Sequence, residues 1–378
     1  MAFEHYVNAG GKRLRRGYTT GTCAALAAAG AAKLLLEGET PQLLRLITPA
    51  GLPVEVEPRV CRMEGEAALC LVEKDGGDDI DATAGLLIGA RVEKVPGSDL
   101  SIEGGAGVGR VTKPGLDQGV GEAAINHVPR EMIRRETDRV RAAAGYAGGL
   151  KVTILVPDGA RAAKRTFNPQ LGIEGGISIL GTSGIVEPMS LSALVDTIAL
   201  ELRQAAALGH RRVILTPGNY GADFLKEHKL GSEMTPIVKC SNFIGEALDF
   251  GAEQGFQEIL LVGHVGKLVK VAGGIMNTHS RWADCRTELF CAHAAMAGAS
   301  RELCRRLMEA ASADACIALL DQEGLREPVM KSLLGAIQAH LDRRSAGAFR
   351  TGAVLFSNQY GLLGKTTGAE EILAEWNR

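Results

Sequence analysis

The chain has 378 residues, of which 46% are hydrophobic and 23% are charged, a composition typical of folded globular domains. Because domains usually contain about 100–200 residues, we expect two domains. The net charge is -2, and nucleic acids and anionic membranes are bound through clustered positive charge, so we expect neither as a partner.

The cysteines and the N-terminal segment indicate a cytoplasmic protein. The eight cysteines include no C-x-x-C pair and no spacing that suggests a disulfide framework, so we expect reduced thiols. The apolar stretch AALAAAGAAKLLL contains Lys33, is followed by Glu37, and is too short and too rich in alanine to span a membrane. We expect a buried or half-buried helix there rather than a signal peptide.

The first half of the chain, residues 1–188, is predicted to be an α+β domain. An alanine-rich helix is expected over 20–36, capped by Thr19 or Thr20 and ended by Gly38. Short extended segments follow with no long helix between them, which indicates an antiparallel or mixed sheet. The segments are 43–48, 54–58, 67–74, 89–95, 99–104 and 109–113, with a helix over 129–144 and a strand over 150–157 after them.

The second half, residues 189–378, is predicted to be an α/β domain. Strands alternate with helices of about ten residues or more, a pattern that indicates a parallel sheet covered by helices on both faces. The expected strands are 212–216, 236–240, 258–263 and 353–357, which gives a mainly parallel sheet of about four strands. The expected helices are 190–208, one after Asn219, 242–254, 281 to about 308, and one around 333–341.

Small or amide-bearing residues follow each of these four strands. Ligands of open α/β sheets bind at the carboxyl ends of the strands, so we expect these residues to form the rim of a pocket. The four strand ends are 217–219, 240–242, 263–265 and 357–359.

The first helix is opened by a basic, threonine-rich motif, RRGYTTGTC. Its glycines, the N–H groups of the helix start and the hydroxyls of Thr19 and Thr20 could bind an anionic group, with Arg15 and Arg16 beside them. An ordinary N-cap behind a basic surface patch explains the pattern equally well.

Two further segments are rich in glycine. The acidic turn at 75–83 lacks the spacing of an EF-hand loop, and a solvated turn is its simplest interpretation, although its carboxylates could include a proton acceptor such as Asp79. The segment at 174–188 joins the two halves and carries more isoleucine and leucine than a flexible linker does. We therefore favour a ligand-lining role for it.

A cluster of polar residues lies just beyond the third predicted strand. Lysines can bind substrate carboxylates, and a histidine can transfer a proton near neutral pH. Neither histidine is accompanied by a close cysteine or carboxylate pattern, so we expect no metal site. The cluster comprises His264, Lys267, Lys270, Asn277 and His279.

Five segments taken in order resemble the CbiD family, the cobalt-precorrin-5B C-1 methyltransferases: RRGYTTGTCAALAAAGAAKLL, GDDIDATAG, GGISILGTSGIVEPMS, TPGNYG and GHVGKLVKVAGGIMNTHS. The resemblance covers residues 13 to about 365, with one local departure at Ile80, where the family more often has proline. It implies methyl transfer from S-adenosylmethionine to C-1 of cobalt-precorrin-5B, giving cobalt-precorrin-6A in anaerobic cobalamin biosynthesis. It also implies a permuted ribosomal-S5-like first domain and a parallel α/β second domain.

This chemistry suggests roles for the residues above. A corrinoid precursor carries many carboxylates, and cobalt enters only as part of that substrate. His264 is the preferred base, before His279 or Asp79, and no covalent nucleophile is required. The cofactor is expected against Gly181, Thr182, Ser183, Gly184, Pro217, Gly218 and Asn219. The substrate is expected against Arg15, Arg16, Thr19, Thr20, Lys267, Lys270, Asn277 and Arg281.

Two other classes of protein compete with this interpretation. The S5-like half is similar to small-molecule kinases, although no glycine-rich phosphate loop stands in the required context. A non-enzymatic tetrapyrrole carrier or chelatase-like module would also use a basic, histidine-containing strand end. The sequence is compatible with a homo-oligomer.

Overall fold

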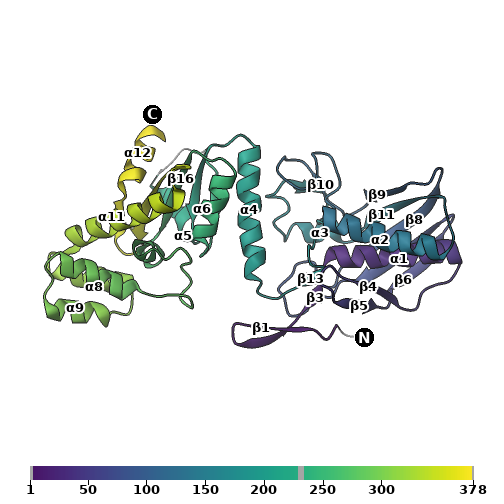
Figure 1. Ribbon diagram of the computed structural model, residues 1–378, viewed down its shortest axis with the longest axis horizontal. Helices are drawn as coiled ribbons and strands as arrows, with labels where there is room; N and C mark the ends of the chain where they lie inside the picture. The colour runs from purple at the N-terminus through teal and green to yellow at the C-terminus, as the bar shows by residue number, and fades with distance from the viewer. Residues whose placement is uncertain (1–2, 229–233, 377–378) are drawn as a thin grey trace. The chain divides into compact units, whose positions relative to one another are not determined.

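The computed structural model describes residues 3–228 and 234–376. The chain forms two compact units, Met1–Ser190 and Leu191–Arg378, and the division lies close to the boundary predicted after residue 188. Figure 1 shows each unit with its own sheet and helices.

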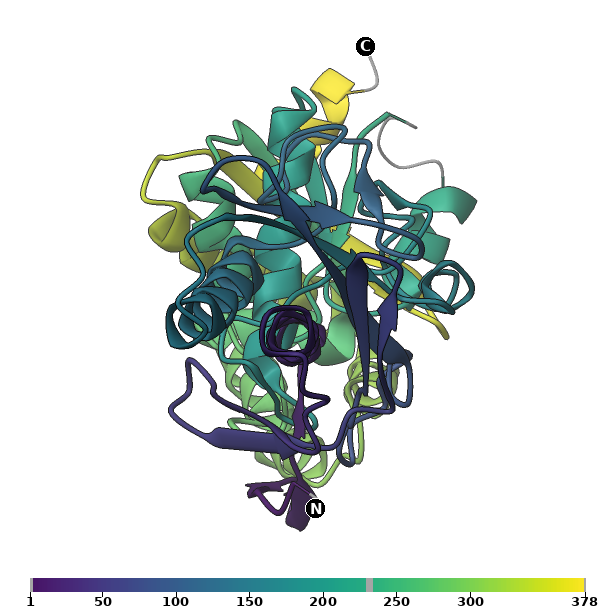
Figure 2. The same cartoon turned by 90° about the vertical axis from the view of Figure 1, so that its right-hand side faces the viewer.

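The first unit is built on a five-stranded mixed sheet with the order β6-β7-β8-β11-β9. Strands β9 and β11 are parallel, and the other pairs are antiparallel. Helices α1 and α2 pack on one face of the sheet, and Figure 2 shows them side by side in a view close to their axes. The bounds are β6 Val60–Glu64, β7 Ala67–Glu73, β8 Leu87–Val95, β9 Leu100–Gly104, β11 Gly149–Leu155, α1 Thr20–Glu37 and α2 His127–Ala143.

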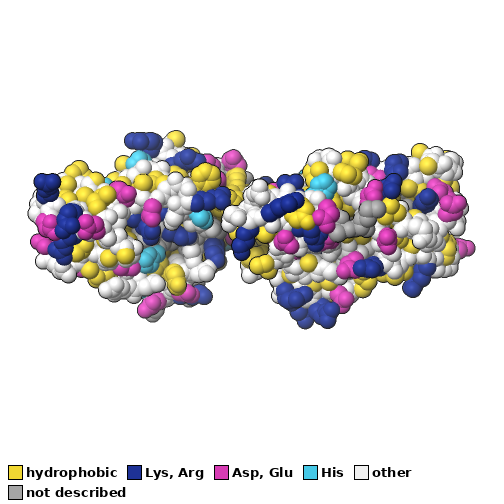
Figure 3. All heavy atoms as spheres, turned by 90° about the horizontal axis from the view of Figure 1, so that it is seen from below, with side chains coloured by type: hydrophobic (Ala, Val, Ile, Leu, Met, Phe, Trp, Pro, Cys, Tyr) yellow, Lys and Arg dark blue, Asp and Glu magenta, His cyan; other side chains and the backbone are white. Residues whose placement is uncertain are grey.

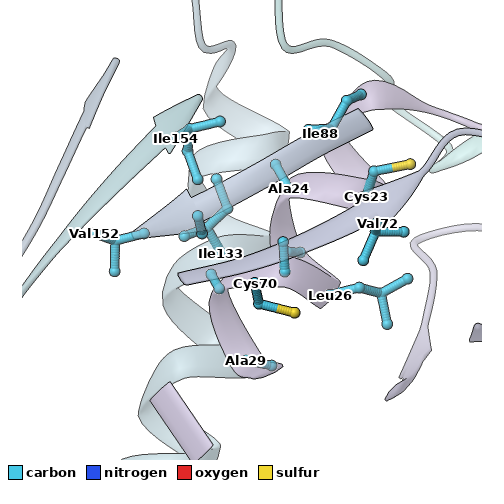
Figure 4. Packing of buried hydrophobic residues seen from close by; sticks show 14 of the residues in the cluster. Cys23, Ala24, Leu26, Ala29, Cys70, Val72, Ile88, Ile133, Val152 and Ile154 are labelled. Carbon is cyan, nitrogen blue, oxygen red and sulfur yellow. The ribbon is translucent and has the colours of Figure 1, made fainter. Parts of the chain in front are cut away.

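Helix α1 forms the centre of this unit's core. Its alanine side chains are small, so the helix axis can lie close to the sheet and to α2 at the same time. Figure 4 shows Leu26 of α1 beside Val72 of β7, and Ile133 of α2 belongs to the same buried cluster. The predicted helix is confirmed: Thr19 caps its start, and Gly38, at a φ of 76°, donates its N–H to Leu34 and ends it.

Four short strand pairs accompany the main sheet. The predicted extended segments at 43–48 and 54–58 form a separate hairpin rather than strands of the main sheet. The sequence analysis did not predict β1, β2 or β6. The pairs are β1 Tyr6–Ala9 with β2 Lys12–Arg15, β4 Leu44–Ile47 with β5 Pro53–Val56, β3 Gly17–Tyr18 with β13 Ile185–Val186, and β10 Arg110–Val111 with β12 Ile173–Glu174; a short helix, α3, covers Gly159–Ala163.

The second unit contains a five-stranded sheet with the order β15-β14-β16-β17-β18. The first four strands are parallel, and β18 pairs antiparallel with β17 at the edge. The sheet is therefore mixed, and the expected count of about four strands omitted β18. The strands are β14 Arg212–Thr216, β15 Ile237–Lys239, β16 Glu258–His264, β17 Arg350–Ser357 and β18 Gly361–Lys365.

Helices cover both faces of this sheet because successive strand residues face opposite sides. On one face, Leu260 and Val262 of β16 pack with α5 and α12. On the other, Ile259 and Leu261 pack with α4, α6 and α11. The helices are α4 Leu191–Ala207, α5 Tyr220–Glu227, α6 Ile244–Glu253, α7 Val265–Leu268, the 3₁₀ helix η1 Val269–Gly273, α8 Arg286–Met296, α9 Arg301–Met308, α10 Ala313–Gln322, α11 Arg326–Ser345 and α12 Thr367–Trp376.

The predicted helix from 281 to about 308 is wrong as a single element. Residues 281–282 form a turn, residues 283–285 have no regular structure, and α8 begins only at Arg286. Gly298, with a φ of 90°, separates α8 from α9. The sequence analysis also did not predict α10 or α12. Over residues 3–228 and 234–376, no helix is both long and apolar enough to cross a membrane.

Candidate functional site

A cavity of about 830 Å³ lies at the carboxyl ends of β14, β15, β16 and β17 in the second unit. Residues that follow each of the four parallel strands line it, at the edge of the sheet where the sequence predicted a pocket rim. The strand-end residues in its wall include Pro217, Gly218, Asn219, Ser241, Asn242, Gly263, His264 and Asn358.

The lining of the cavity is predominantly cationic. Among the described residues that line it, Lys239, Lys267, Lys270 and Arg286 are basic and only Asp314 is acidic. Figure 3 shows lysine, arginine and histidine side chains close together on one face of the second unit. A cavity with this balance of charge attracts anionic ligands.

Two of these cations hold neighbouring backbone in place. Lys270 is buried, and its Nζ donates to the carbonyl oxygens of Thr278 at 3.1 Å and Ala283 at 2.9 Å, so it fixes the loop between η1 and α8. The Nζ of Lys267 donates to the carbonyl oxygen of Pro217. Burial lowers the pKa of both lysines, because a charged ammonium is less stable away from water.

Both predicted histidines line the cavity, and a backbone N–H fixes the orientation of each ring. His264 caps α7: its Nδ1 accepts from the N–H of Gly266 at 3.1 Å. His279 is exposed, and its Nδ1 accepts from the N–H of Arg281 at 3.1 Å. In both neutral rings the proton therefore lies on Nε2.

The sequence analysis missed the single acidic group of the cavity, Asp314, in the first turn of α10. Its Oδ1 accepts from the hydroxyl of Ser357 at 2.6 Å, and its Oδ2 lies 3.9 Å from Nε2 of His264. Ser312 caps this helix by accepting from the N–H of Ala315. A serine two residues before an aspartate is a helix-start signal, and it could have located this residue.

Two predicted substrate residues of the second unit do not line this cavity. Asn277 is half-buried, and its Oδ1 accepts from the N–H of His279 at 3.2 Å. The guanidinium of Arg281 lies over the ring of Trp282, 5.2 Å from its centroid. Both belong to the loop that Lys270 holds.

The predicted substrate residues of the first unit lie at the start of α1 or just before it, and they form internal contacts. Arg15 forms a bidentate ion pair with Asp75, and Arg16 pairs with Glu187 at 2.5 Å. Thr19 and Thr20 are buried, the former as N-cap of α1.

The segment containing the predicted cofactor residues 181–184 is bonded to this helix start. The hydroxyl of Thr20 accepts from the N–H of Leu180 at 2.9 Å, and the hydroxyl of Thr22 donates to the carbonyl of Gly184 at 2.7 Å. Gly181 has a φ of 130°, and an added Cβ would lie 2.3 Å from Oγ1 of Thr19. Of the four residues, Thr182 is exposed, and the hydroxyl of Ser183 bonds to the backbone of Ile185.

The acidic turn is held by charges of its own unit. Besides the pair of Asp75 with Arg15, the buried Lys74 pairs with Asp81. Asp79, the third candidate base, is half-buried, and its Oδ1 accepts from the N–H of Met189 at 3.3 Å. Across the described part of the chain, no three histidine, cysteine, aspartate or glutamate side chains are grouped to hold a metal ion.

Comparison with known proteins covers both units. Residues 7–188 match the family model CbiD, and residues 277–367 match the model of the CbiD C-terminal domain. A cobalt-precorrin-5B C(1)-methyltransferase from Ruminiclostridium cellulolyticum is 45% identical over 98% of both chains. Another from Alkaliphilus metalliredigens is 41% identical over 98% of this chain and 97% of its own.

A solved structure is also similar in sequence. It is the crystal structure of the cobalamin biosynthesis protein CbiD from Archaeoglobus fulgidus, 31% identical over 71% of this chain and 83% of its own, with a TM-score of 0.39. The family models match more than half of the chain, and the curated relatives match nearly all of it. The chain therefore belongs to the CbiD family.

Proposed function

We propose that this chain is a methyltransferase that transfers a methyl group from S-adenosylmethionine to C-1 of cobalt-precorrin-5B. The product is cobalt-precorrin-6A, an intermediate of anaerobic cobalamin biosynthesis. The observation that carries the proposal is the 45% identity, over 98% of both chains, with a relative named for this reaction. The cationic cavity of the second unit supports it, because the substrate is a polycarboxylate.

The cavity has the size and the donor set that S-adenosylmethionine needs. Its volume of about 830 Å³ is within the range of small-molecule sites, roughly 300–1,000 Å³. The amide oxygens of Asn242 and Asn358 offer acceptors for an ammonium or for ribose hydroxyls, and the lysines offer donors for a carboxylate. When bound, the cofactor supplies an electrophilic methyl group on a sulfonium.

Positioning is the main task of the residues in this proposal. Pro217, Gly218 and Asn219 form the turn against which we place the cofactor, and residues 181–184 of the first unit are a separate candidate segment for cofactor contacts. The Nζ of Lys267 donates to the carbonyl oxygen of Pro217 and so helps to hold this turn in place. Holding the two reacting atoms about 3–3.5 Å apart and aligned lowers the barrier without covalent catalysis.

The substrate carboxylates are assigned to cations. In the cavity these are Lys239, Lys267 and Arg286, while Lys270 contributes charge through its structural position. The residues predicted from the sequence outside the cavity stay in the proposal as candidate contacts: Arg15, Arg16, Thr19, Thr20, Asn277 and Arg281.

We also assign the first unit to a permuted ribosomal-S5-like fold, place the protein in the cytoplasm, and include a homo-oligomer as a compatible state. None of the three affects how the cavity would act on its ligands.

Anaerobic incubation with cobalt-precorrin-5B and methyl-labelled S-adenosylmethionine, followed by mass analysis of the ring, tests the function. We expect one labelled methyl per ring. Lys267→Met should lower the rate about 10–100-fold, because a charge-assisted contact contributes about 1.5–3 kcal/mol. Lys226→Met, an exposed lysine on α5, is the matched control and should behave as wild type. Binding of the ring without any transfer would contradict the proposal and favour a tetrapyrrole carrier.

A further inference from the structure

Backbone N–H groups determine where the protons lie around Asp314. The hydroxyl oxygen of Ser357 accepts from the N–H of Gln359 at 3.0 Å and from that of Tyr360 at 3.3 Å. A hydroxyl has two acceptor positions and one proton, so with both acceptor positions used its proton points to its remaining partner. That partner is Oδ1 of Asp314, 2.6 Å away.

The proton of the neighbouring histidine is fixed in the same way. Because Nδ1 of His264 accepts from Gly266, the neutral ring carries its proton on Nε2. This Nε2–H lies 3.9 Å from Oδ2 of Asp314. His264 therefore presents a donor at Nε2, and the neutral ring has no free lone pair there to act as a base.

The proton of His279 is fixed in the same way. Its Nδ1 accepts from the N–H of Arg281, so its Nε2 also carries the proton. Neither histidine lining the cavity is then a proton acceptor in its neutral form. Among the described side chains in the cavity wall, the one carboxylate is Asp314.

We propose that Asp314 is the proton acceptor of the reaction, and that Ser357 and His264 are positioning residues that orient its carboxylate. The proposal rests on the proposed methyl transfer and replaces His264 as the base. Oδ1 is held by the serine hydroxyl, which leaves Oδ2 as the atom available to a ligand.

Charge balance explains why a base is needed. Methylation of the conjugated ring by a sulfonium adds one positive charge to the ring, and the charge is removed when a proton leaves. In the proposed step, C-1 of the ring forms a bond to the methyl carbon, the methyl–sulfur bond breaks with its electron pair staying on sulfur, and S-adenosylhomocysteine leaves. A ring N–H or C–H bond then breaks, and its electron pair stays in the conjugated system. The proton forms a new O–H bond with Oδ2 of Asp314. A well-placed general base contributes about 10²–10⁴ in rate.

Asp314→Asn is the first test. It keeps the size of the side chain and an oxygen that can accept from Ser357, but it removes the carboxylate oxygen that would take the proton. We expect the rate of methyl transfer to fall at least 100-fold, with affinity for S-adenosylhomocysteine changed by less than about threefold. His264→Gln and Ser357→Ala should each lower the rate about tenfold. Glu309→Gln, at an exposed carboxylate beyond α9, is the control and should match wild type.

Chemical rescue separates a proton acceptor from a structural residue. Asp314→Ala leaves space where formate can bind, and added formate should restore part of its rate while leaving Asp314→Asn unchanged. The inference would be overturned if Asp314→Asn transferred the methyl group at a rate within threefold of wild type. It would also be overturned if His264→Gln lowered the rate more than Asp314→Asn does. If Asp314→Asn does not fold, a folded Asp314→Ala whose rate is not restored by formate would also overturn the inference. In all of these outcomes wild type transfers the methyl; if it does not, the proposed function itself fails.

Discussion

Two regions of the molecule are rich in glycine, serine and threonine, and they use these residues differently. At the start of α1, the hydroxyls of Thr20 and Thr22 bond to residues 178–184 of the same unit and are buried. At the strand ends of the second unit, the small residues leave space, and charged side chains face a cavity of about 830 Å³.

The comparison shows that the number of small and hydroxyl-bearing residues does not distinguish close packing from ligand binding. The difference lies in the space beside each residue. A Cβ on Gly181 would collide with Thr19, whereas a Cβ on Gly218 would meet nothing within 4 Å. Substitutions at these two glycines should therefore affect different properties of the protein.

Gly181→Ala should have the largest effect on stability. It combines a φ of 130° with a contact of 2.3 Å, and we expect a loss of roughly 2–4 kcal/mol in the unfolding free energy of the first unit. Both tryptophans, Trp282 and Trp376, lie in the second unit, so circular dichroism should reveal a transition that tryptophan fluorescence does not follow. Gly175 has a φ of 80°, but the space beside it is open, so Gly175→Ala should lose less stability than Gly181→Ala. Equal losses of stability in the two variants would show that the contact with Thr19 does not cause the destabilisation of Gly181→Ala.

Thr20→Val should destabilise the same unit by about 1–3 kcal/mol. The valine keeps the shape but leaves the N–H of Leu180 without the hydroxyl that accepts from it. Chemical denaturation followed by circular dichroism measures this loss. If Thr20 also contacts the substrate, the KM for the corrinoid will rise in addition. An unchanged unfolding free energy would show that the buried hydroxyl does not hold this segment.

Gly218→Ala should leave stability unchanged within about 0.5 kcal/mol, because the new methyl meets no protein atom. The methyl would occupy the space in which we place the cofactor. We therefore expect the Kd for S-adenosylhomocysteine, measured by calorimetry, to rise about tenfold, which corresponds to roughly 1.4 kcal/mol. Unchanged affinity would move the cofactor away from this turn.

The smallest expected effect is a pH dependence in the core of the second unit. Burial lowers the pKa of His293, whose Nδ1 lies 2.7 Å from the hydroxyl of Ser332. Below the ordinary value of 6.5 the unfolded chain binds a proton that the folded one does not, so stability is lost as the pH falls from 6.5 toward the lowered value. The loss is at most about 1.4 kcal/mol for each pH unit between the two values.

Tryptophan fluorescence during denaturation at pH 7.5 and pH 5.0 measures this dependence. His293→Gln should lose less stability than wild type between the two conditions. The same loss in both proteins would show that another group is responsible.

Much of the fold could be predicted from the sequence, because alternation and caps are local signals. The strand at 212–216 has the predicted bounds, and Gly38 ends α1 as expected. The edge strand β18, GLLGK, contains two glycines and resembles a turn, so its pairing depends on β17. The break between α8 and α9 was missed because the residues on both sides of Gly298 favour helix.

The candidate site was predictable in position but less so in detail. Strand ends identified the cavity wall, since topology alone brings them to one edge. The burial of Lys270 and its bonds to two carbonyls depend on a loop path that no sequence pattern specifies. Asp314 comes from a helix far along the chain, and only the folded structure brings it beside His264.

Hydrogen exchange measured by mass spectrometry, with and without S-adenosylhomocysteine, tests the central claim most directly: that the ligands bind at the strand ends of the second unit. Protection should increase in peptides covering 217–221, 263–270 and 312–316. Protection confined to residues 15–23 and 174–188, with the strand ends of the second unit unchanged, would contradict the account.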